Sequence, residues 1–205
     1  MKHYVYRMCY SNVTLMVYWI MTTIIYSHPW QGSFNRAILD GIEKKLRDEE
    51  RSFQVIDLVK DGFNPTMTTA DLALYNRGEA ADPIVAKYGE MLQGSDELII
   101  IFPIWWGMMP AIFKGFLDKV LLKGVAYNYS DEGAMLPAFD INRTLLITTS
   151  QGPTALYRHF IEDTLISFVL NSVGITGVKW LNCEKTAHGP RENRDAFLKN
   201  VIKEV

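Results

Sequence analysis

Short apolar runs alternate with segments of helical period along most of this chain, and no other feature of the sequence constrains the fold as strongly. Five runs have the length and composition of strands: residues 22–27, 53–57, 98–102, 144–149 and 178–183. The third, LIIIF, is continuously apolar, as is typical of a strand that is covered on both faces. Strands that alternate with helices indicate right-handed crossovers, and therefore a parallel sheet with helices on both faces.

The segments between these runs carry helix signals. Ser33 is a favourable N-cap for a helix in which apolar residues recur every fourth position. Asp82 and Pro83 predict the start of a second helix, which ends near Gly94. Three further helices are expected to begin at Pro110 and to cover residues 161–173 and 190–202. The longest irregular stretch, residues 61–81, is expected to be functional or to hold short structure of its own.

Residues 1–20 lie outside this alternating pattern. They hold five aromatic residues, two basic residues and no acidic residue. The apolar run at 13–26 is shorter than the roughly 17 to 25 residues of a membrane-spanning helix, and no small-residue cleavage site follows it. We therefore expect an extension outside one domain that covers residues 21–205, with a membrane anchor or a signal peptide as the alternatives.

The composition excludes several classes of function. A chain of 205 residues that is 48% hydrophobic with a formal net charge of -2 is not disordered, and it lacks the basic surface of a typical nucleic-acid binder. Two cysteines cannot form a disulfide framework, which favours a cytoplasmic protein. The four histidines show no metal-ligand spacing, so no metal site is expected. Dinucleotide, P-loop and serine-hydrolase motifs are also absent from the sequence.

Ligands of open parallel sheets bind beyond the carboxyl ends of the strands, so the residues that follow each apolar run are the informative ones. The first run leads into a loop and a serine-capped helix, whose free N–H groups and positive dipole end suit a phosphate. An ordinary strand-to-helix turn is the alternative. The phosphate-binding candidates of this segment are His28, Ser33, Phe34 and Asn35.

Two adjacent tryptophans follow the third run, at Trp105 and Trp106. Side chains next to each other in sequence point in different directions, and full burial of tryptophan is uncommon, so the two cannot easily both belong to the core. Flanking prolines stiffen this loop, and Gly107 permits close approach of a ligand. We expect a stacking wall for a flat aromatic molecule; an adhesive dimer surface is a compatible alternative.

Hydroxyl groups, an amide and a glycine follow the fourth run and form a polar nest suited to the carbonyl oxygens of a planar ring. A simple Ser/Gly turn is the alternative. The residues of this nest are Thr148, Thr149, Ser150, Gln151 and Gly152. Tyr157 and His159 come shortly afterwards and are candidates for supplying a proton.

Together the three loops resemble those of the flavodoxin-like NAD(P)H:quinone oxidoreductases, the family of DT-diaphorase and its bacterial relatives. The resemblance extends from about residue 22 to the end of the chain. It rests on SHP at 27–29, SFN at 33–35, GFNP at 62–65, one long block at 81–120 and GVAY at 124–127.

The resemblance implies a doubly wound, flavodoxin-like α/β fold with five parallel strands in the order 2-1-3-4-5. It places the phosphates of a flavin at His28, Ser33, Phe34 and Asn35. It places the isoalloxazine ring against Pro103, Ile104, Trp105, Trp106 and Gly107. The pyrimidine edge of the ring would meet Thr148, Thr149, Ser150, Gln151 and Gly152.

The implied reaction passes hydride from NADH or NADPH through flavin N5 to a quinone or a similar flat acceptor, by a ping-pong mechanism. The GFNP segment resembles the branch that uses FAD, with FMN as the alternative, and relatives are usually homodimers. An electron-carrying flavodoxin and a regulatory flavoprotein subunit of an ion-efflux or stress system are the alternative functions.

The sequence also departs from the family pattern. Relatives often have two glycines after the paired threonines, where this chain has Ser150 and Gln151. The tyrosine and histidine that relatives carry beyond this turn align only with a gap. Tyr157 is a plausible equivalent of the first, whereas His159 lies too early to correspond directly to the second.

Overall fold

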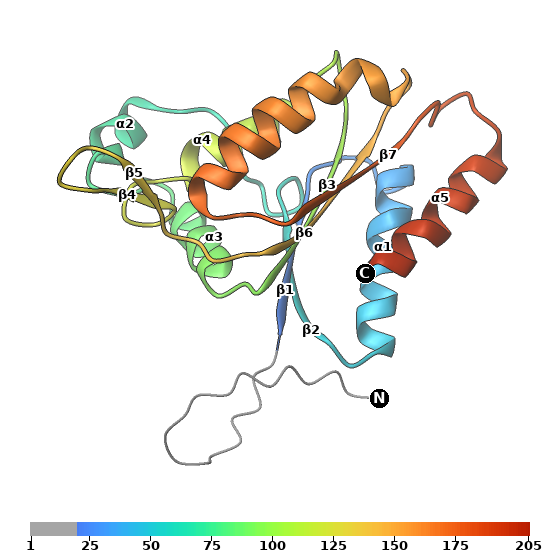
Figure 1. Cartoon of the computed structure of the whole chain (residues 1–205), viewed down its shortest axis with the longest axis horizontal. Helices are drawn as coiled ribbons and strands as arrows, with labels where there is room; N and C mark the ends of the chain where they lie inside the picture. The colour runs from blue at the N-terminus through green and yellow to red at the C-terminus, as the bar shows by residue number, and fades with distance from the viewer. Residues whose placement is uncertain (1–19) are drawn as a thin grey trace.

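A five-stranded parallel sheet forms the centre of the computed structural model, which describes residues 20–205 (Figure 1). Its strands lie in the order β2-β1-β3-β6-β7, which confirms the predicted order. Their bounds are β1 (Met21–Tyr26), β2 (Ser52–Asp57), β3 (Glu97–Pro103), β6 (Arg143–Thr149) and β7 (Val178–Cys183). All seven residues of β3 are buried, because this strand lies at the middle of the sheet with helices on both faces. The predicted extension at residues 1–20 falls outside the described residues, except for its last one.

Helices cover both faces of the sheet (Figure 1). On one face α1 (Phe34–Asp48) and α5 (Arg191–Glu204) enclose an apolar core that includes Ile24 of β1. On the other face α3 (Pro83–Gln93), α4 (Ala111–Val120) and η2 (His159–Leu170) enclose a second core that includes Ile25. Neighbouring residues of one strand thus enter opposite cores, as the pleat requires, and the prediction of a doubly wound α/β fold is confirmed.

The structure confirms two of the predicted helix N-caps. The Ser33 side chain caps α1, accepting a hydrogen bond of 3.0 Å from the N–H of Arg36. The Asp82 side chain caps α3 and accepts from the N–H of Ile84, at 3.1 Å. Each cap satisfies an N–H group that the first helical turn would otherwise leave without a partner.

Several elements lie outside the predicted alternation. A short helix, α2 (Thr69–Tyr75), forms within the long stretch at 61–81, where short structure was expected. A small antiparallel hairpin, β4 (Tyr127–Tyr129) and β5 (Met135–Pro137), was not predicted. The short helical turns η1 (Thr154–Tyr157) and η3 (Asn171–Val173) flank η2. The structure starts η2 two residues earlier than predicted and winds it as a π-helix.

A buried ion pair fastens the segment at 61–81 to α4. Lys119 of α4 is 4% exposed, and its Nζ lies 3.1 Å from the carboxylate of Asp71. The same ammonium donates hydrogen bonds to the carbonyl oxygens of Asn64 and Thr66, at 3.2 and 3.3 Å. The three acceptors together compensate for the cost of removing the charge from water.

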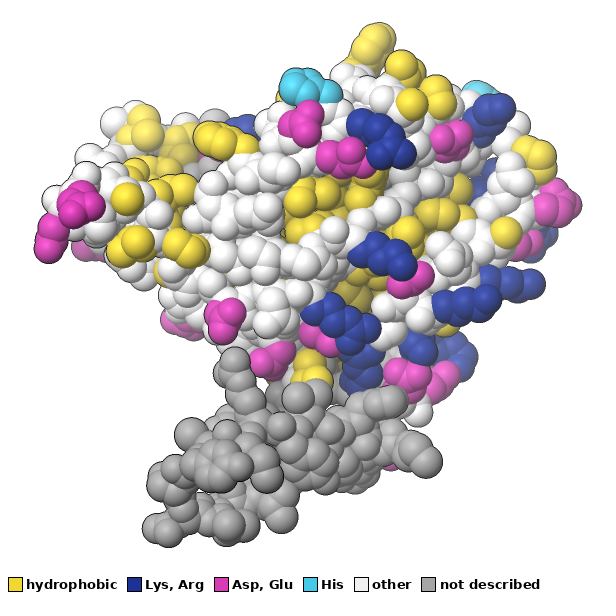
Figure 2. Space-filling model, viewed as in Figure 1, with side chains coloured by type: hydrophobic (Ala, Val, Ile, Leu, Met, Phe, Trp, Pro, Cys, Tyr) yellow, Lys and Arg dark blue, Asp and Glu magenta, His cyan; other side chains and the backbone are white. Residues whose placement is uncertain are grey.

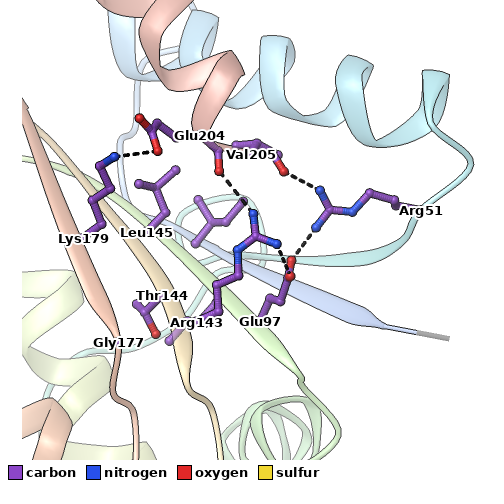
Figure 3. A pocket seen from close by; sticks show the side chains of 11 residues that line it. Arg51, Glu97, Arg143, Thr144, Leu145, Gly177, Lys179, Glu204 and Val205 are labelled. Atoms are coloured by element: carbon purple, nitrogen blue, oxygen red, sulfur yellow. Dashed lines mark hydrogen bonds and ion pairs between the residues drawn. The ribbon is translucent and has the colours of Figure 1, made fainter. Parts of the chain in front are cut away.

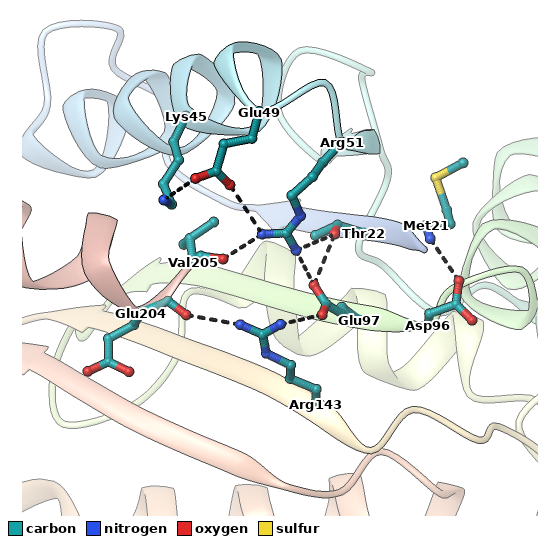
Figure 4. Close-up of polar contacts among 10 residues, drawn as sticks. All are labelled: Met21, Thr22, Lys45, Glu49, Arg51, Asp96, Glu97, Arg143, Glu204 and Val205. Carbon is teal, nitrogen blue, oxygen red and sulfur yellow. Dashed lines mark hydrogen bonds and ion pairs between the residues drawn. The ribbon is translucent and has the colours of Figure 1, made fainter. Parts of the chain in front are cut away.

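Glu97 joins the strands at the amino edge of the sheet (Figure 4). Its carboxylate accepts hydrogen bonds from Arg51, from Arg143 at 2.5 Å and from the Thr22 hydroxyl at 3.2 Å. These partners belong to β1, β6 and the residue just before β2. One carboxylate at the start of the central strand therefore connects segments from four parts of the chain.

Candidate functional site

The loops that follow β1, β3 and β6 meet at the carboxyl edge of the sheet. The N–H of Ile104 donates to the carbonyl oxygen of Thr149 at 2.7 Å, which joins the β3 and β6 loops. The Asn35 side chain donates to the Thr149 hydroxyl at 2.8 Å, which joins the start of α1 to the end of β6. The rings of His28 and Trp105 lie 5.7 Å apart, edge to face. The structure thus brings together the three groups of residues that the sequence nominated.

The start of α1 has the features of an anion-binding helix end. Ser33 is 7% exposed, and its hydroxyl lies 3.4 Å from the Tyr26 hydroxyl. Phe34 packs against Phe197 of α5, with ring centroids 6.2 Å apart, which fixes the first turn against its neighbour. Backbone N–H groups and the positive end of the helix dipole at this point favour a negatively charged group.

Asn35 carries a buried acceptor that has no partner. The residue is 3% exposed, and while its Nδ2 binds Thr149, its Oδ1 forms no hydrogen bond with any described residue. A buried amide oxygen without a donor costs free energy on the order of 1–3 kcal/mol. A bound molecule with a hydroxyl or N–H group would remove this cost, so the carboxyl edge fits a polar ligand such as a flavin nucleotide.

His28 can donate a hydrogen bond as a neutral imidazole. Its Nδ1 accepts a hydrogen bond of 3.1 Å from the N–H of Trp30, so the proton of the neutral ring resides on Nε2. Partial burial lowers the pKa of His28, because desolvation disfavours the charged imidazolium. The Nε2–H group is therefore available to donate to an anion near neutral pH.

The β3 loop (residues 104–110) projects its tryptophans through a tight turn. Trp105 and Met108 exchange two backbone hydrogen bonds of 2.9 and 3.1 Å. Between them Trp106 and Gly107 have φ values of +51° and +80°, the left-handed region that is costly for a residue with a large side chain. The side chain of Trp106 is fully exposed and that of Trp105 is 46% exposed, so neither belongs to the core.

The other two residues predicted for this wall are located differently. Pro103 is the last residue of β3 and is buried, and Ile104 is 7% exposed. The side chains of Pro103 and Ile104 therefore contribute little surface at this edge. A wall there would consist of the two tryptophan side chains and the backbone of Pro103 and Ile104.

The β6 turn (residues 150–152) holds Tyr157 in place. The N–H of Gly152 donates to the Tyr157 hydroxyl at 3.2 Å. A Cβ atom at residue 152 would lie 2.4 Å from that hydroxyl oxygen, so only glycine permits the approach. Thr148, Thr149 and Ser150 are at most 4% exposed, whereas Gln151 is exposed. The predicted proton donor Tyr157 and the predicted polar nest are therefore adjacent.

His159 lies apart from these loops. Its side chain is 89% exposed on η2, and its Nδ1 lies 2.9 Å from the carboxylate of Asp163, one helical turn further on. Within residues 20–205 no hydrogen bond or ring contact joins it to the three loops. A catalytic role for His159 stays a prediction that its present surroundings do not favour.

Two residues of β7 take part in the site that the sequence did not nominate. Asn182 and Trp180 form hydrogen bonds with the Thr148 hydroxyl, at 2.9 and 2.8 Å. The parallel pairing of β6 with β7 places Asn182 directly beside Thr148. The position of an asparagine close to the carboxyl end of the predicted strand at 178–183 is the signal that could have indicated it.

A cavity of about 230 Å³ lies at the opposite, amino edge of the sheet (Figure 3). Charged side chains line it, but they bind one another: Lys179 lies 2.7 Å from Glu204, and Arg143 pairs with Glu97. Arg51 donates to the carbonyl oxygen of Val205 at 2.5 Å. These contacts hold the end of α5 against the sheet. The cavity is therefore separate from the predicted site, which lies at the carboxyl edge.

Residues 20–205 contain no group of three or more side chains that could bind a metal ion, and none of their helices is long and apolar enough to cross a membrane. On the face shown in Figure 2, basic and acidic side chains are interspersed, and apolar side chains reach the surface between η2 and α5.

Comparisons with known proteins agree with this architecture. A family model described as "Flavodoxin-like fold" matches residues 21–205, and the chain belongs to this family. A protein of Streptococcus mutans UA159 with a solved structure is 26% identical, with a TM-score of 0.76 over 90% of this chain and 97% of that one.

Two relatives have names that indicate an activity. An Escherichia coli protein named an uncharacterized NAD(P)H oxidoreductase is 33% identical over 116 residues, which are 56% of this chain and 57% of the relative. The match thus spans little more than half the length of that protein. An FMN-dependent NADH:quinone oxidoreductase of Clostridium acetobutylicum is 25% identical over 82% of this chain and 86% of its own length. These names confirm the resemblance to NAD(P)H oxidoreductases.

Proposed function

We propose that this protein is a flavin-dependent NAD(P)H oxidoreductase that reduces a quinone or a similar flat acceptor. The observation that carries the proposal is the convergence of three loops at one sheet edge. There Trp105, one of two adjacent exposed tryptophans, lies against His28 in the loop that leads to the helix end at Ser33, and the buried oxygen of Asn35 lacks a donor. The names of the relatives support the same activity.

The residues of this edge can hold the different parts of a flavin nucleotide. The first turn of α1 and the Nε2–H of His28 suit the phosphate. The exposed face of Trp105 suits stacking with the flat ring. The exposed residue Gln151 of the β6 turn suits the polar edge of the ring.

When bound, the flavin supplies the hydride chemistry, accepting two electrons from NAD(P)H and passing them to the acceptor. The protein's part is to orient the two flat substrates and to stabilise charge. Trp105 and Trp106 line the exposed side of the site, where donor and acceptor would bind in turn, so we expect ping-pong kinetics. The Tyr157 hydroxyl accepts from Gly152, which leaves its own proton free to donate to a developing anion.

The identity of the flavin is a separate part of the proposal. The GFNP segment at 62–65 favoured FAD, whereas the Clostridium acetobutylicum relative is named FMN-dependent. The edge described above would hold the part that FMN and FAD share. Mass spectrometry of flavin released from the purified protein distinguishes the two.

We also propose a cytoplasmic homodimer. Trp106 and Met108 on the β3 loop and Tyr129, Met135 and Leu136 on the β4–β5 hairpin are all more than 40% exposed. Burial of such apolar side chains against a second copy would remove them from water. We expect light scattering to give twice the chain mass; a monomer at micromolar concentration would contradict this part.

Loading the purified protein with FMN or FAD and adding NADH or NADPH tests the activity. We expect NAD(P)H oxidation that depends on both a flavin and a quinone, with parallel double-reciprocal plots. A protein that binds neither flavin would contradict the proposal. Flavin binding without NAD(P)H oxidation would instead indicate an electron carrier.

A further inference from the structure

Asn182 is the centre of a hydrogen-bond network between the ends of β6 and β7. Its Oδ1 accepts from the Thr148 hydroxyl at 2.9 Å. Its Nδ2 donates to the hydroxyls of Ser150 and Thr154, each at 3.0 Å. One half-buried amide thus holds three hydroxyl groups that flank the candidate site, and it links β6, the β6 turn and η1.

The chemistry of the partners fixes the direction of these bonds. Trp180 can only donate, and its Nε1 lies 2.8 Å from the Thr148 oxygen, so Thr148 accepts there and has its own proton for Asn182. The Asn182 amide must then direct its N–H groups at Ser150 and Thr154. The orientation of Asn182 is therefore determined by the network.

The network continues from Asn182 to Tyr157. The Ser150 hydroxyl accepts from Asn182 and donates to the carbonyl oxygen of Gly152 at 2.8 Å. The N–H of Gly152 in turn donates to the Tyr157 hydroxyl at 3.2 Å. A directed chain of hydrogen bonds thus runs from β7 through the β6 turn to the predicted proton donor.

Side-chain hydrogen bonds stiffen the β6 turn. Ser150 forms its bonds to Asn182 and Gly152 through its hydroxyl. Gln151 accepts from the N–H of Ala187 at 3.2 Å, and Thr186 binds the carbonyl oxygen of Ser150 at 2.9 Å. The side chains of Ser150, Gln151 and Thr186 therefore brace the turn.

We propose that Asn182 is a positioning residue of the candidate site. It holds the β6 turn through Ser150, and through that turn it fixes the hydroxyl of Tyr157. The proposal rests on the proposed function, since it assigns Asn182 a role in placing groups that face the flavin and the acceptor. Asn182 itself need not touch either of them.

Hydrogen exchange and flavin binding test this role in the full chain. Asn182→Ala removes the N–H donors to Ser150 of the turn and to Thr154 of η1. Asn182→Asp keeps the shape and the acceptor but removes the same two donors. Gln54→Glu is the matched control, because it removes the same two kinds of donor from another half-buried amide, which lies on β2 and binds Thr23 and Met91. Loss of one such hydrogen bond corresponds to a change of about tenfold in an equilibrium constant.

In both Asn182 variants we expect amide exchange at residues 150–152 of the flavin-free protein to become about tenfold faster, and flavin affinity to fall about tenfold. Gln54→Glu should leave both quantities within about twofold of wild type, and its melting temperature should fall as much as that of Asn182→Asp. Combining Asn182→Asp with Tyr157→Phe should reduce quinone turnover by less than the product of the single effects, because both act through one turn.

The outcomes separate this proposal from the function on which it rests. Wild-type exchange and flavin affinity in the Asn182 variants would overturn the positioning role and leave the oxidoreductase proposal standing. Equal losses in Gln54→Glu would also overturn it, since they would indicate a general loss of stability and no specific role of Asn182. If Asn182→Ala does not fold, Asn182→Asp gives the same readouts. A wild-type protein that binds no flavin would contradict both proposals.

Discussion

Trp105 is the residue at which burial and function can be told apart most readily. Its ring lies edge to face against His28 and is 46% exposed. A core tryptophan would contribute mainly to folding, whereas an exposed one beside a candidate binding site contributes to folding only through its covered part.

We expect Trp105→Ala to weaken flavin or quinone binding by about tenfold, because a stacking partner contributes on the order of 0.5–1.5 kcal/mol. Fluorescence titration measures the affinity, and a thermal melt of the flavin-free protein measures stability. Phe168→Ala is the control, since Phe168 is another exposed aromatic side chain and lies on η2. A loss of melting temperature without loss of affinity would show that Trp105 is structural.

The sequence indicated these residues by their position after apolar runs, but not their pairings. Asn35 and Thr149 were each nominated, yet the bond between them joins residues 114 positions apart and depends on the strand order. A role for Asn182 was not predicted, because this residue lies inside a predicted strand and its neighbours follow only from the register with β6. Pro103 and Ile104 were expected at the ligand surface, but the end of β3 is buried.

At the scale of elements, the strands that are long and apolar were predictable, because their signals are local. The β4–β5 hairpin has strands of only three residues and exposed side chains, so it leaves no periodic pattern. The π-winding of η2 likewise has no signal in its apolar spacing. Within η2 the hydroxyls of Thr164 and Ser167 donate to the carbonyl oxygens of His159 and Glu162, each five residues earlier, which is the offset of a π-helical turn.

The attachment of α2 to α4 leads to a prediction about acid. Burial by itself would raise the pKa of Asp71, but the hydrogen bonds from Thr68 and the ion pair with Lys119 outweigh it and lower that pKa below the ordinary 3.8. The ionised carboxylate therefore stabilises the folded state above pH 3.8, and this contribution is lost as the pH falls through the lowered pKa.

We expect Asp71→Asn to reduce the free energy of unfolding by about 3 kcal/mol at pH 7, because Lys119 remains buried without its counter-ion. The difference from wild type should shrink as the pH falls below about 4, because the unfolded wild-type chain then binds a proton at Asp71, which the folded protein takes up only at lower pH. Denaturant unfolding across this range measures it, with the exposed Asp131→Asn as a control. A difference that stays constant down to pH 3 would contradict the role of the ion pair.

At the scale of the whole molecule, the amino and carboxyl edges of the sheet differ in how their polar groups are paired. The amino edge is closed by ion pairs around Glu97 that join four parts of the chain, and its cavity is lined by charges that are paired with one another (Figures 3 and 4). The carboxyl edge instead presents exposed tryptophans and a buried acceptor without a donor. We therefore expect stability to depend mainly on the first edge and ligand binding on the second.

Glu97→Ala should therefore destabilise the protein without changing its site. Two guanidinium groups lose their shared carboxylate, and we expect a loss of about 3 kcal/mol in the free energy of unfolding. For a chain of this size that corresponds to a fall of roughly 10 °C in melting temperature. Flavin affinity, measured well below the transition, should stay within about twofold of wild type. A large loss of affinity in the folded variant would show that the two edges are coupled.

The central claim is that the carboxyl edge binds a flavin through which NAD(P)H reduces an acceptor. The most direct test mixes the flavin-loaded protein with NADH or NADPH in the absence of oxygen, and then adds a quinone. We predict that the visible absorption of the oxidised flavin disappears on the first addition and returns on the second, and that Trp105→Ala slows both steps. Absorption that does not change on addition of either nicotinamide nucleotide would contradict the claim.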